Sequence, residues 1–214
     1  MAQLKKVSGT LVVLLLLVGL PAVSYYYLKT GYTYRKDAIL TQEDFGKMPD
    51  LSALPVVRGK RPASYRGAMN VVGWLDPTKP VASRQYGTML DSLYQQFKDS
   101  PNLYFTTLVL AKDPAAAVTD FTTEHNLPAS GMLTFLRADE NQFARTAADF
   151  KLPLGGYDAP GEDPIVALVD SSLTVVKHYN LDHRSETIGL VQLVSVIIPL
   201  PERKDLILER AKEL

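Results

Sequence analysis

The stretch AMNVVGWLDPTKPVAS, residues 68–83, decides the fold of this chain. Residues 68–75 form an apolar run with the length of a buried strand, and the run ends at Asp76-Pro77. Residues 84–98 then carry apolar side chains at the three- and four-residue spacing of an amphipathic helix. A buried strand that passes through a short loop into a helix is the first unit of an α/β domain.

Strand-like and helix-like stretches alternate through the chain that follows. We expect strands over 102–111 and 133–136, helices over 115–125 and 141–150, a hairpin of 165–169 with 173–179, and a helix over 185–198. The folded domain is therefore expected to span residues 63–199, and a charged C-terminal helix is expected over residues 200–214.

The N-terminal segment has the composition of a membrane span. Residues 7–28 contain no charged side chain, and roughly 20 apolar residues are enough for a helix to cross the hydrocarbon core. We expect a transmembrane helix here, preceded by a cytoplasmic leader over residues 1–6 and followed by a connector over residues 29–62. Tyr25, Tyr26 and Tyr27 fit rings that lie at the headgroup level where the helix leaves the membrane.

This arrangement predicts a single-pass protein of the cytoplasmic (inner) membrane, with the lipid bilayer as a partner and the C-terminal domain on the periplasmic side. Lys5 and Lys6 before the span favour that orientation. The alternative is a cleaved signal peptide, because Ala22-Val23-Ser24 resembles a small-residue processing site.

Composition excludes several kinds of chemistry. The chain contains no cysteine, so it cannot form a disulfide, a thiolate metal ligand or a redox-active CxxC pair. Its 23 basic residues are balanced by 23 acidic ones without a dense basic stripe, which argues against nucleic acid as a partner.

The order strand-helix-strand-helix, followed by a hairpin and a last helix, resembles the thioredoxin fold. Over residues 51–199 the chain is similar to the Sco/SenC family of membrane-tethered copper chaperones for cytochrome oxidase, with the hairpin over residues 168–180 among the local patterns. The resemblance implies a thioredoxin-like α/β domain with a central mixed sheet flanked by helices.

In that family, the first strand runs into a Cys-Pro-x-x-x-Cys-type loop whose thiols bind copper or exchange with a disulfide. The resemblance places Lys79 and Ser83 at the two cysteine positions, and Glu162 in the region of the histidine ligand. A charged lysine has no free lone pair, and a serine hydroxyl is a poor ligand for a soft copper ion. The resemblance therefore implies a degenerate member that binds no metal or other cofactor. Thioredoxin-like folds often carry a cis-proline beside the active loop, so a cis peptide bond before Pro164 is a further hypothesis.

A retained fold with replaced ligand positions implies a redox-inactive protein that is not an enzyme. The family's role points to an accessory subunit or assembly factor of a respiratory, cytochrome oxidase-type membrane complex, although a fold does not by itself identify a function. The candidate interaction surface contains Asp76, Pro77, Lys79, Tyr157 and Asp163.

Two alternatives stay open at this point. Lys79 precedes a helix whose positive end would lower the pKa of its amine, which would suit a small-molecule binder or a cysteine-independent enzyme. A metal site can also be drawn from His178, Asp182 and His183, but zinc sites need three or four convergent ligands, and this segment has the pattern of a strand end and a loop.

Overall fold

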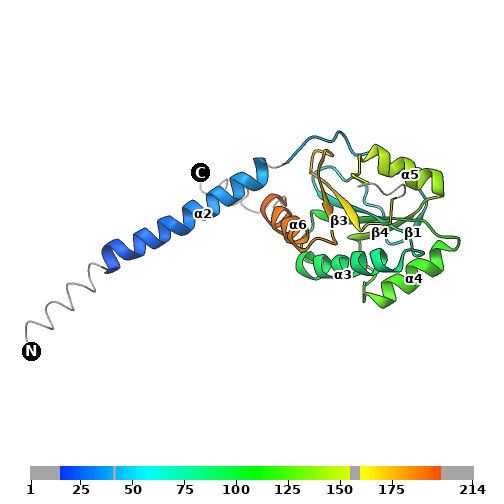
Figure 1. Ribbon diagram of the computed structural model, residues 1–214, viewed down its shortest axis with the longest axis horizontal. Coiled ribbons are helices and arrows are strands. Elements are labelled where there is room, and N and C mark those ends of the chain that lie inside the picture. Colours follow the sequence, from blue (N-terminus) through cyan, green and yellow to red (C-terminus); the bar gives the residue numbers. More distant parts are fainter. Residues whose placement is uncertain (1–14, 41, 155–159, 199–214) are drawn as a thin grey trace, which may run out of the picture. The chain divides into compact units, whose positions relative to one another are not determined.

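The computed structural model describes residues 15–40, 42–154 and 160–198 of the chain (Figure 1). The chain divides into two compact units, Met1–Thr41 and Gln42–Leu214, and each is described here by itself. The expected C-terminal helix over 200–214 lies outside the described residues, as do residues 1–14 and Tyr157.

The first unit is helical wherever it is described. A π-helical turn, η1 (Leu15–Gly19), leads into helix α2 (Leu20–Leu40). Pro21 closely follows the π-helical turn and lacks the N–H that a regular helical bond to the preceding turn would use, and no further proline follows before Leu40. The connector expected from residue 29 onward is therefore helical in its first part. None of the described helices combines the length and the apolar character needed to cross a membrane.

The second unit is built on a six-stranded mixed sheet with the strand order β1-β4-β3-β2-β5-β6. Strands β2, β3 and β4 run parallel to one another, whereas β1 pairs antiparallel with β4, β5 with β2, and β6 with β5. The strands are β1 (Val56–Arg58), β2 (Met69–Leu75), β3 (Leu103–Val109), β4 (Leu133–Arg137), β5 (Ile165–Val169) and β6 (Val175–Asn180).

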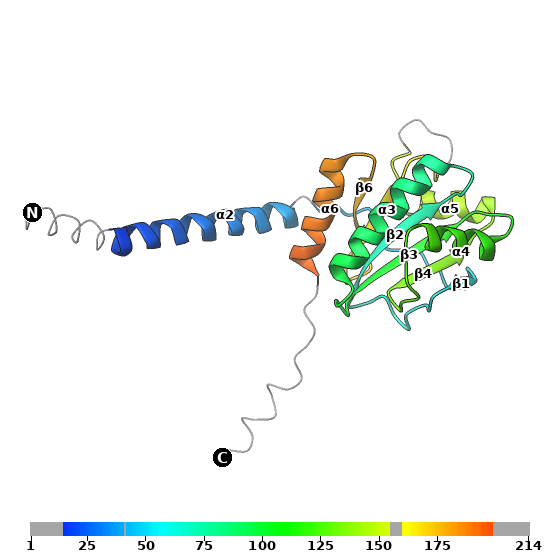
Figure 2. The same ribbon diagram turned by 90° about the horizontal axis from the view of Figure 1, so that it is seen from below.

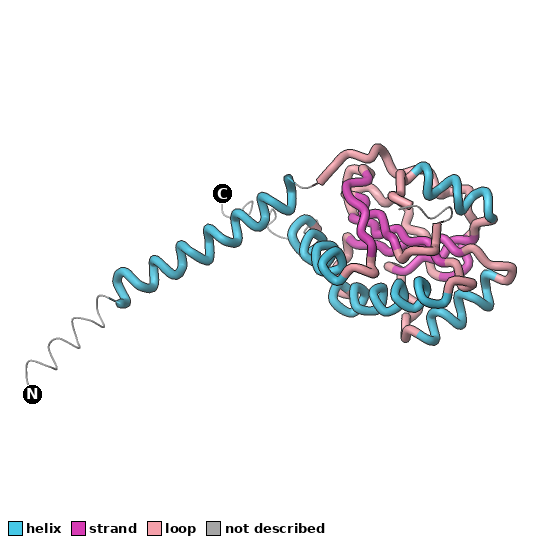
Figure 3. Tube along the Cα trace, in the orientation of Figure 1, coloured by secondary structure: helices cyan, strands magenta, loops and turns pink. Residues whose placement is uncertain are grey.

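Helices cover both faces of this sheet, which forms the central layer in Figure 3. The helices are α3 (Pro80–Phe97), α4 (Pro114–Glu124), α5 (Glu140–Asp149) and α6 (Arg184–Ile197). The crossovers through α3 and α4 step along the sheet in the same direction, and right-handed connections then place both helices on one face. Helix α6 lies beside α3, and α5 covers the opposite face (Figure 1, Figure 2).

The core forms around β2, all seven of whose residues are buried. Trp74 is 3% exposed, and its ring meets Phe150 edge-on at a centroid distance of 5.2 Å. The indole N–H of Trp74 has no hydrogen-bond partner among the described residues. Trp74 is thus a packing residue beneath α5, as its place in an apolar run predicts.

The structure differs from the sequence expectations at several boundaries. Helix α3 begins at Pro80 rather than Arg84, because proline suits the first helical position, where its fixed φ is already helical. The expected connector contains β1, and its residues Glu43 and Phe45 donate backbone hydrogen bonds to β6 over 2.9 and 3.0 Å. The cis bond hypothesised before Pro164 is absent, since every peptide bond in the described ranges is trans.

Candidate functional site

The loop after β2 is organised around Asp76, which is only 9% exposed. The Oδ1 atom of Asp76 accepts hydrogen bonds from the backbone N–H of Thr78 at 2.9 Å and from the Thr78 hydroxyl at 2.7 Å. The Asp76 carbonyl accepts from the N–H of Lys79 at 3.0 Å and from the Ser83 hydroxyl at 2.8 Å. These bonds fix the turn between β2 and α3, so Asp76 orders the loop rather than projecting from it.

Lys79 and Glu162 meet across this loop. The Nζ of Lys79 lies 2.6 Å from Oε1 of Glu162, and the two side chains are 41% and 31% exposed. Glu162 precedes β5, which pairs with β2, so the sheet brings together residues that are 83 positions apart. Two of the three positions that the resemblance assigns to metal ligands therefore form an ion pair with each other.

The pair changes the expected chemistry of Lys79. The hydrogen bond from Lys79 to Glu162 and the negative charge of that carboxylate raise the pKa of the lysine above its ordinary value. This direction is opposite to the lowered pKa that the start of helix α3 led us to expect, because a nearby carboxylate stabilises the charged amine directly. A more basic lysine is a weaker nucleophile at neutral pH, so the geometry gives no support to Lys79 as a reactive group.

Ser83 lies one helical turn beyond Lys79, and its backbone N–H donates to the Lys79 carbonyl at 3.0 Å. The Ser83 hydroxyl donates to the Asp76 carbonyl, so the side chain supports the loop. Across the described ranges, no group of three or more histidine or carboxylate side chains is arranged to hold a metal ion.

The alternative histidine cluster does not come together either. His178 bonds through Nε2 to the Phe150 carbonyl at 2.8 Å, whereas His183 faces Glu186, with 3.3 Å between Nδ1 and Oε1. Asp182 accepts a hydrogen bond from Gln85 of α3. The three side chains thus serve three separate local contacts.

The expected interaction surface is partly accessible. Pro77 is exposed, and Lys79 and Asp163 are partly exposed, whereas Asp76 is buried. Val81 lies within the expected rim over residues 76–83 but was not singled out from the sequence, and it is 72% exposed in the first turn of α3. In the sequence, Val81 is an apolar residue directly after Lys79-Pro80. That position indicates an exposed helix start only when α3 is known to begin at Pro80. We call the accessible residues Pro77, Lys79, Val81 and Asp163 the rim surface.

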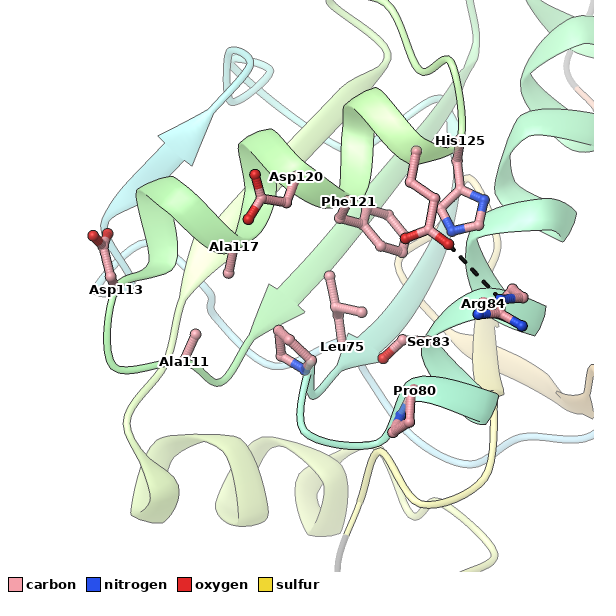
Figure 4. Close-up of a pocket in the computed structure, with 12 residues that line it drawn as sticks. Leu75, Pro80, Ser83, Arg84, Ala111, Asp113, Ala117, Asp120, Phe121 and His125 are labelled. Atoms are coloured by element: carbon pink, nitrogen blue, oxygen red, sulfur yellow. Dashed lines mark ion pairs between the residues drawn. The ribbon is translucent and has the colours of Figure 1, made fainter.

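A pocket of about 420 Å³ lies next to this surface, between α3 and α4 (Figure 4). It opens at the carboxyl ends of the parallel strands β2 and β3. Its apolar side includes Leu75, Ala117 and Phe121, and its polar side includes Arg84 and His125. No local pattern in the sequence indicates this pocket, since its residues come from separate parts of the chain.

Comparison with known proteins identifies the fold. No family model matches the sequence, and no curated protein matches it. Among solved structures, a putative protein disulfide isomerase from Bacteroides thetaiotaomicron aligns with a TM-score of 0.54 and 16% identity, over 73% of this chain and 90% of that chain.

Two Sco-family structures are also similar. BsSco, described as a member of the Sco family of cytochrome c oxidase assembly proteins, aligns with a TM-score of 0.55 and 14% identity, over 72% of this chain and 96% of that chain. A SCO1/SenC family lipoprotein from Bacillus anthracis str. Ames gives a TM-score of 0.56 and 10% identity, over 72% of this chain and 97% of that chain.

The second unit is therefore a thioredoxin-like α/β domain with a mixed sheet between layers of helices. Its structural neighbours include both Sco/SenC proteins and thioredoxin-like oxidoreductases. At these identities the likeness establishes the fold, whereas function depends on the site.

Proposed function

We propose that this protein is a redox-inactive, non-catalytic Sco-like component of a membrane complex, an accessory subunit or assembly factor of a respiratory, cytochrome oxidase-type assembly. The single observation that carries the proposal is the ion pair between Lys79 and Glu162. It occupies the region where the family resemblance places two metal ligands, and the chain contains no cysteine that could replace them.

The replaced site favours a binding role over catalysis. Lys79, Ser83 and Asp76 are all engaged in contacts that hold the loop and the start of α3. A loop held this way presents a fixed surface, and a rigid surface loses little conformational entropy when a partner docks. Val81 supplies an exposed apolar side chain on the rim surface, and the buried core of a protein interface is usually more apolar than its edge.

The proposed location is the inner membrane, with the thioredoxin-like domain on the periplasmic side. The support is the uncharged segment 7–28, the two lysines before it and the tyrosines that follow. A tether to the membrane would keep the domain close to a membrane-embedded complex and raise its effective concentration there.

The test is to isolate the tagged, full-length chain from native membranes in mild detergent and to measure both the co-purifying proteins and the haem absorbance. Val81→Arg places a bulky charge on the rim surface. Gln96→Arg is the matched control, because Gln96 is exposed about 20 Å further along α3. Circular dichroism establishes that both variants are folded.

We expect the parent and Gln96→Arg to recover haem-containing subunits in stoichiometric amounts, and Val81→Arg to lose most of them. If the parent is recovered alone and haem-free, both directly and after cross-linking in intact membranes, the proposed respiratory role is wrong. Equal recovery by all three chains would place the contact elsewhere than on the rim surface.

A further inference from the structure

A methionine sulfur of this chain faces a buried amide. Met48 lies in the segment before β1, and its Sδ atom accepts a hydrogen bond from Nδ2 of Asn70 on β2 over 3.9 Å. Asn70 is fully buried, and its Oδ1 atom accepts from the Thr106 hydroxyl at 3.0 Å. Among the described residues, the Met48 sulfur is thus the acceptor that the amide group of Asn70 uses.

A thioether is a poor partner for this amide. The sulfur of methionine is only a weak hydrogen-bond acceptor, whereas the N–H groups of a buried asparagine need acceptors because they have lost their contacts with water. Oxidation of methionine to its sulfoxide adds a polar oxygen to the sulfur. That oxygen would accept from the Asn70 amide more strongly than the sulfur does. The surroundings of Met48 therefore suit the oxidised side chain better than an apolar setting would.

Met48 is also within reach of a small oxidant. The residue is half-buried, and it lines a pocket of about 310 Å³ together with Pro49, Pro62 and Leu173. The pocket lies near the amino end of β2, so it is separate from the rim surface at the carboxyl end. A space of this volume can admit small molecules. Met48 therefore combines contact with a buried donor and access from solvent.

The rest of the chain offers a peroxide few competing groups. No cysteine is present, so no thiolate reacts in place of a methionine. Met69 and Met89 are only 1% and 6% exposed. Met132 is half-buried like Met48, but the hydrogen bonds that it makes to described residues involve its backbone and not its sulfur. Met48 alone among these four joins solvent access to an amide donor.

The position of Met48 does not depend on its sulfur. Its backbone N–H donates to the Leu173 carbonyl at 2.8 Å. The Nζ atom of the neighbouring Lys47 donates to the Ser172 carbonyl at 3.2 Å and to the Thr174 hydroxyl at 2.8 Å. These bonds attach the segment to the hairpin of β5 and β6, and a change at the sulfur leaves all of them in place.

We propose that Met48 is a modification site at which small peroxides oxidise the thioether to a sulfoxide, and that Asn70 accommodates the product. A sulfur lone pair attacks one peroxide oxygen, and the S–O bond forms as the O–O bond breaks. The hydroxide that leaves takes up the remaining proton and departs as water, so the sulfur is oxidised and the peroxide is reduced. The Asn70 amide then donates to the sulfoxide oxygen. The step needs neither a thiol nor a metal, and it does not depend on the proposed partner complex.

The first experiment treats the full-length chain in detergent micelles with hydrogen peroxide and measures the oxidation of each methionine by peptide mass spectrometry. We expect Met48 to be oxidised at least about tenfold faster than Met69 and Met89, because oxidation follows exposure. We also expect the circular dichroism spectrum to stay that of the folded domain after Met48 is oxidised, and a methionine sulfoxide reductase to restore the original mass.

A double-mutant cycle tests the role of Asn70 without an oxidant. Met48→Gln supplies a carbonyl acceptor in place of the sulfoxide, whereas Met48→Leu is an apolar replacement of similar volume. We expect the two variants to unfold at the same urea concentration in the parent background. In an Asn70→Val background, where the donor is gone, Met48→Gln should unfold at a lower urea concentration than Met48→Leu.

Met132→Gln and Met132→Leu are the matched control pair, and they keep the test valid if Asn70→Val does not fold. We expect Met132→Gln to unfold at a lower urea concentration than Met132→Leu, because no amide donor faces the Met132 sulfur among the described residues. The proposal is wrong if Met48 is oxidised no faster than Met69 and Met89, if its oxidation unfolds the domain, or if glutamine is as unfavourable at position 48 as at position 132.

Discussion

The ammonium group of Lys79 lies 2.6 Å from Oε1 of Glu162 and joins the start of α3 to the segment before β5. The pair lies at the end of the sheet where the resemblance to Sco proteins implies a metal site. Both side chains stay partly exposed, so salt and water screen the interaction. The pair is therefore not a main source of stability, and only the proposed function treats it as standing in place of a metal site.

Glu162→Gln is expected to lower the pKa of Lys79 toward its ordinary value, because the glutamate is the main cause of the raised value. Since the folded-state pKa is raised, the pair stabilises the fold below the ordinary pKa of lysine. That contribution is lost as the pH rises through the raised value. An NMR titration of the lysine side-chain signals measures the shift, and Glu186→Gln, on α6, is the control. An unchanged Lys79 pKa in Glu162→Gln would contradict the pairing.

His178 gives the domain a defined response to acid. Burial lowers the pKa of this histidine, even though its hydrogen bond to the Phe150 carbonyl acts in the opposite direction. Because the unfolded chain then binds the proton more readily, the stabilising effect is complete above about pH 6.5 and is lost as the pH falls through the lowered value.

His178→Gln keeps a donor for the Phe150 carbonyl but cannot titrate. We expect the free energy of unfolding in urea, measured between pH 5 and 7.5, to depend less on pH in this variant than in the parent. His183→Gln is the control, because the His183 side chain is 61% exposed. The account of His178 fails if His178→Gln and His183→Gln change the slope equally.

Two glycine substitutions should have opposite effects on stability. Gly87→Ala forces a Cβ atom against His125 and should destabilise the domain by about 1–3 kcal/mol, the usual cost of overpacking. Gly189→Ala in α6 meets Tyr179 only at 3.5 Å and should stabilise the domain by about 0.5–1 kcal/mol, through helix propensity. Urea unfolding of both variants provides the comparison, and stabilisation by Gly87→Ala would show that His125 does not pack as described.

The fold could be predicted from the sequence because its signals are local. The apolar run over 68–75, the helical spacing over 84–98 and the hairpin pattern each depend on neighbouring residues, and their order identified the α/β class. The expected ends of helices and strands were less accurate where a single residue, such as Pro80, sets the end. Helix α3 begins four residues earlier than expected, and β1 is too short to stand out from the connector.

The site was predictable only in part. The resemblance located Lys79, Ser83 and Glu162, but the sequence did not show that Lys79 and Glu162 pair, because the contact depends on the register of β2 with β5. The sequence also predicted a lowered pKa for Lys79, because it indicated the nearby helix terminus but not the contact with Glu162. The pocket at His125 escaped notice for the same reason, although a glycine inside the helical pattern at position 87 was a local signal of close packing.

The most direct test of a replaced metal site is to restore it. We would prepare the full-length triple variant Lys79→Cys, Ser83→Cys, Glu162→His under reducing conditions. The variant and the parent are both exposed to Cu(I). Bound copper is then measured after dialysis against a competing chelator. The account predicts about one copper ion per chain in the triple variant, since two thiolates and an imidazole are suitable ligands for Cu(I), and none in the parent. A folded triple variant without copper, or a parent that binds copper equally well, would contradict it.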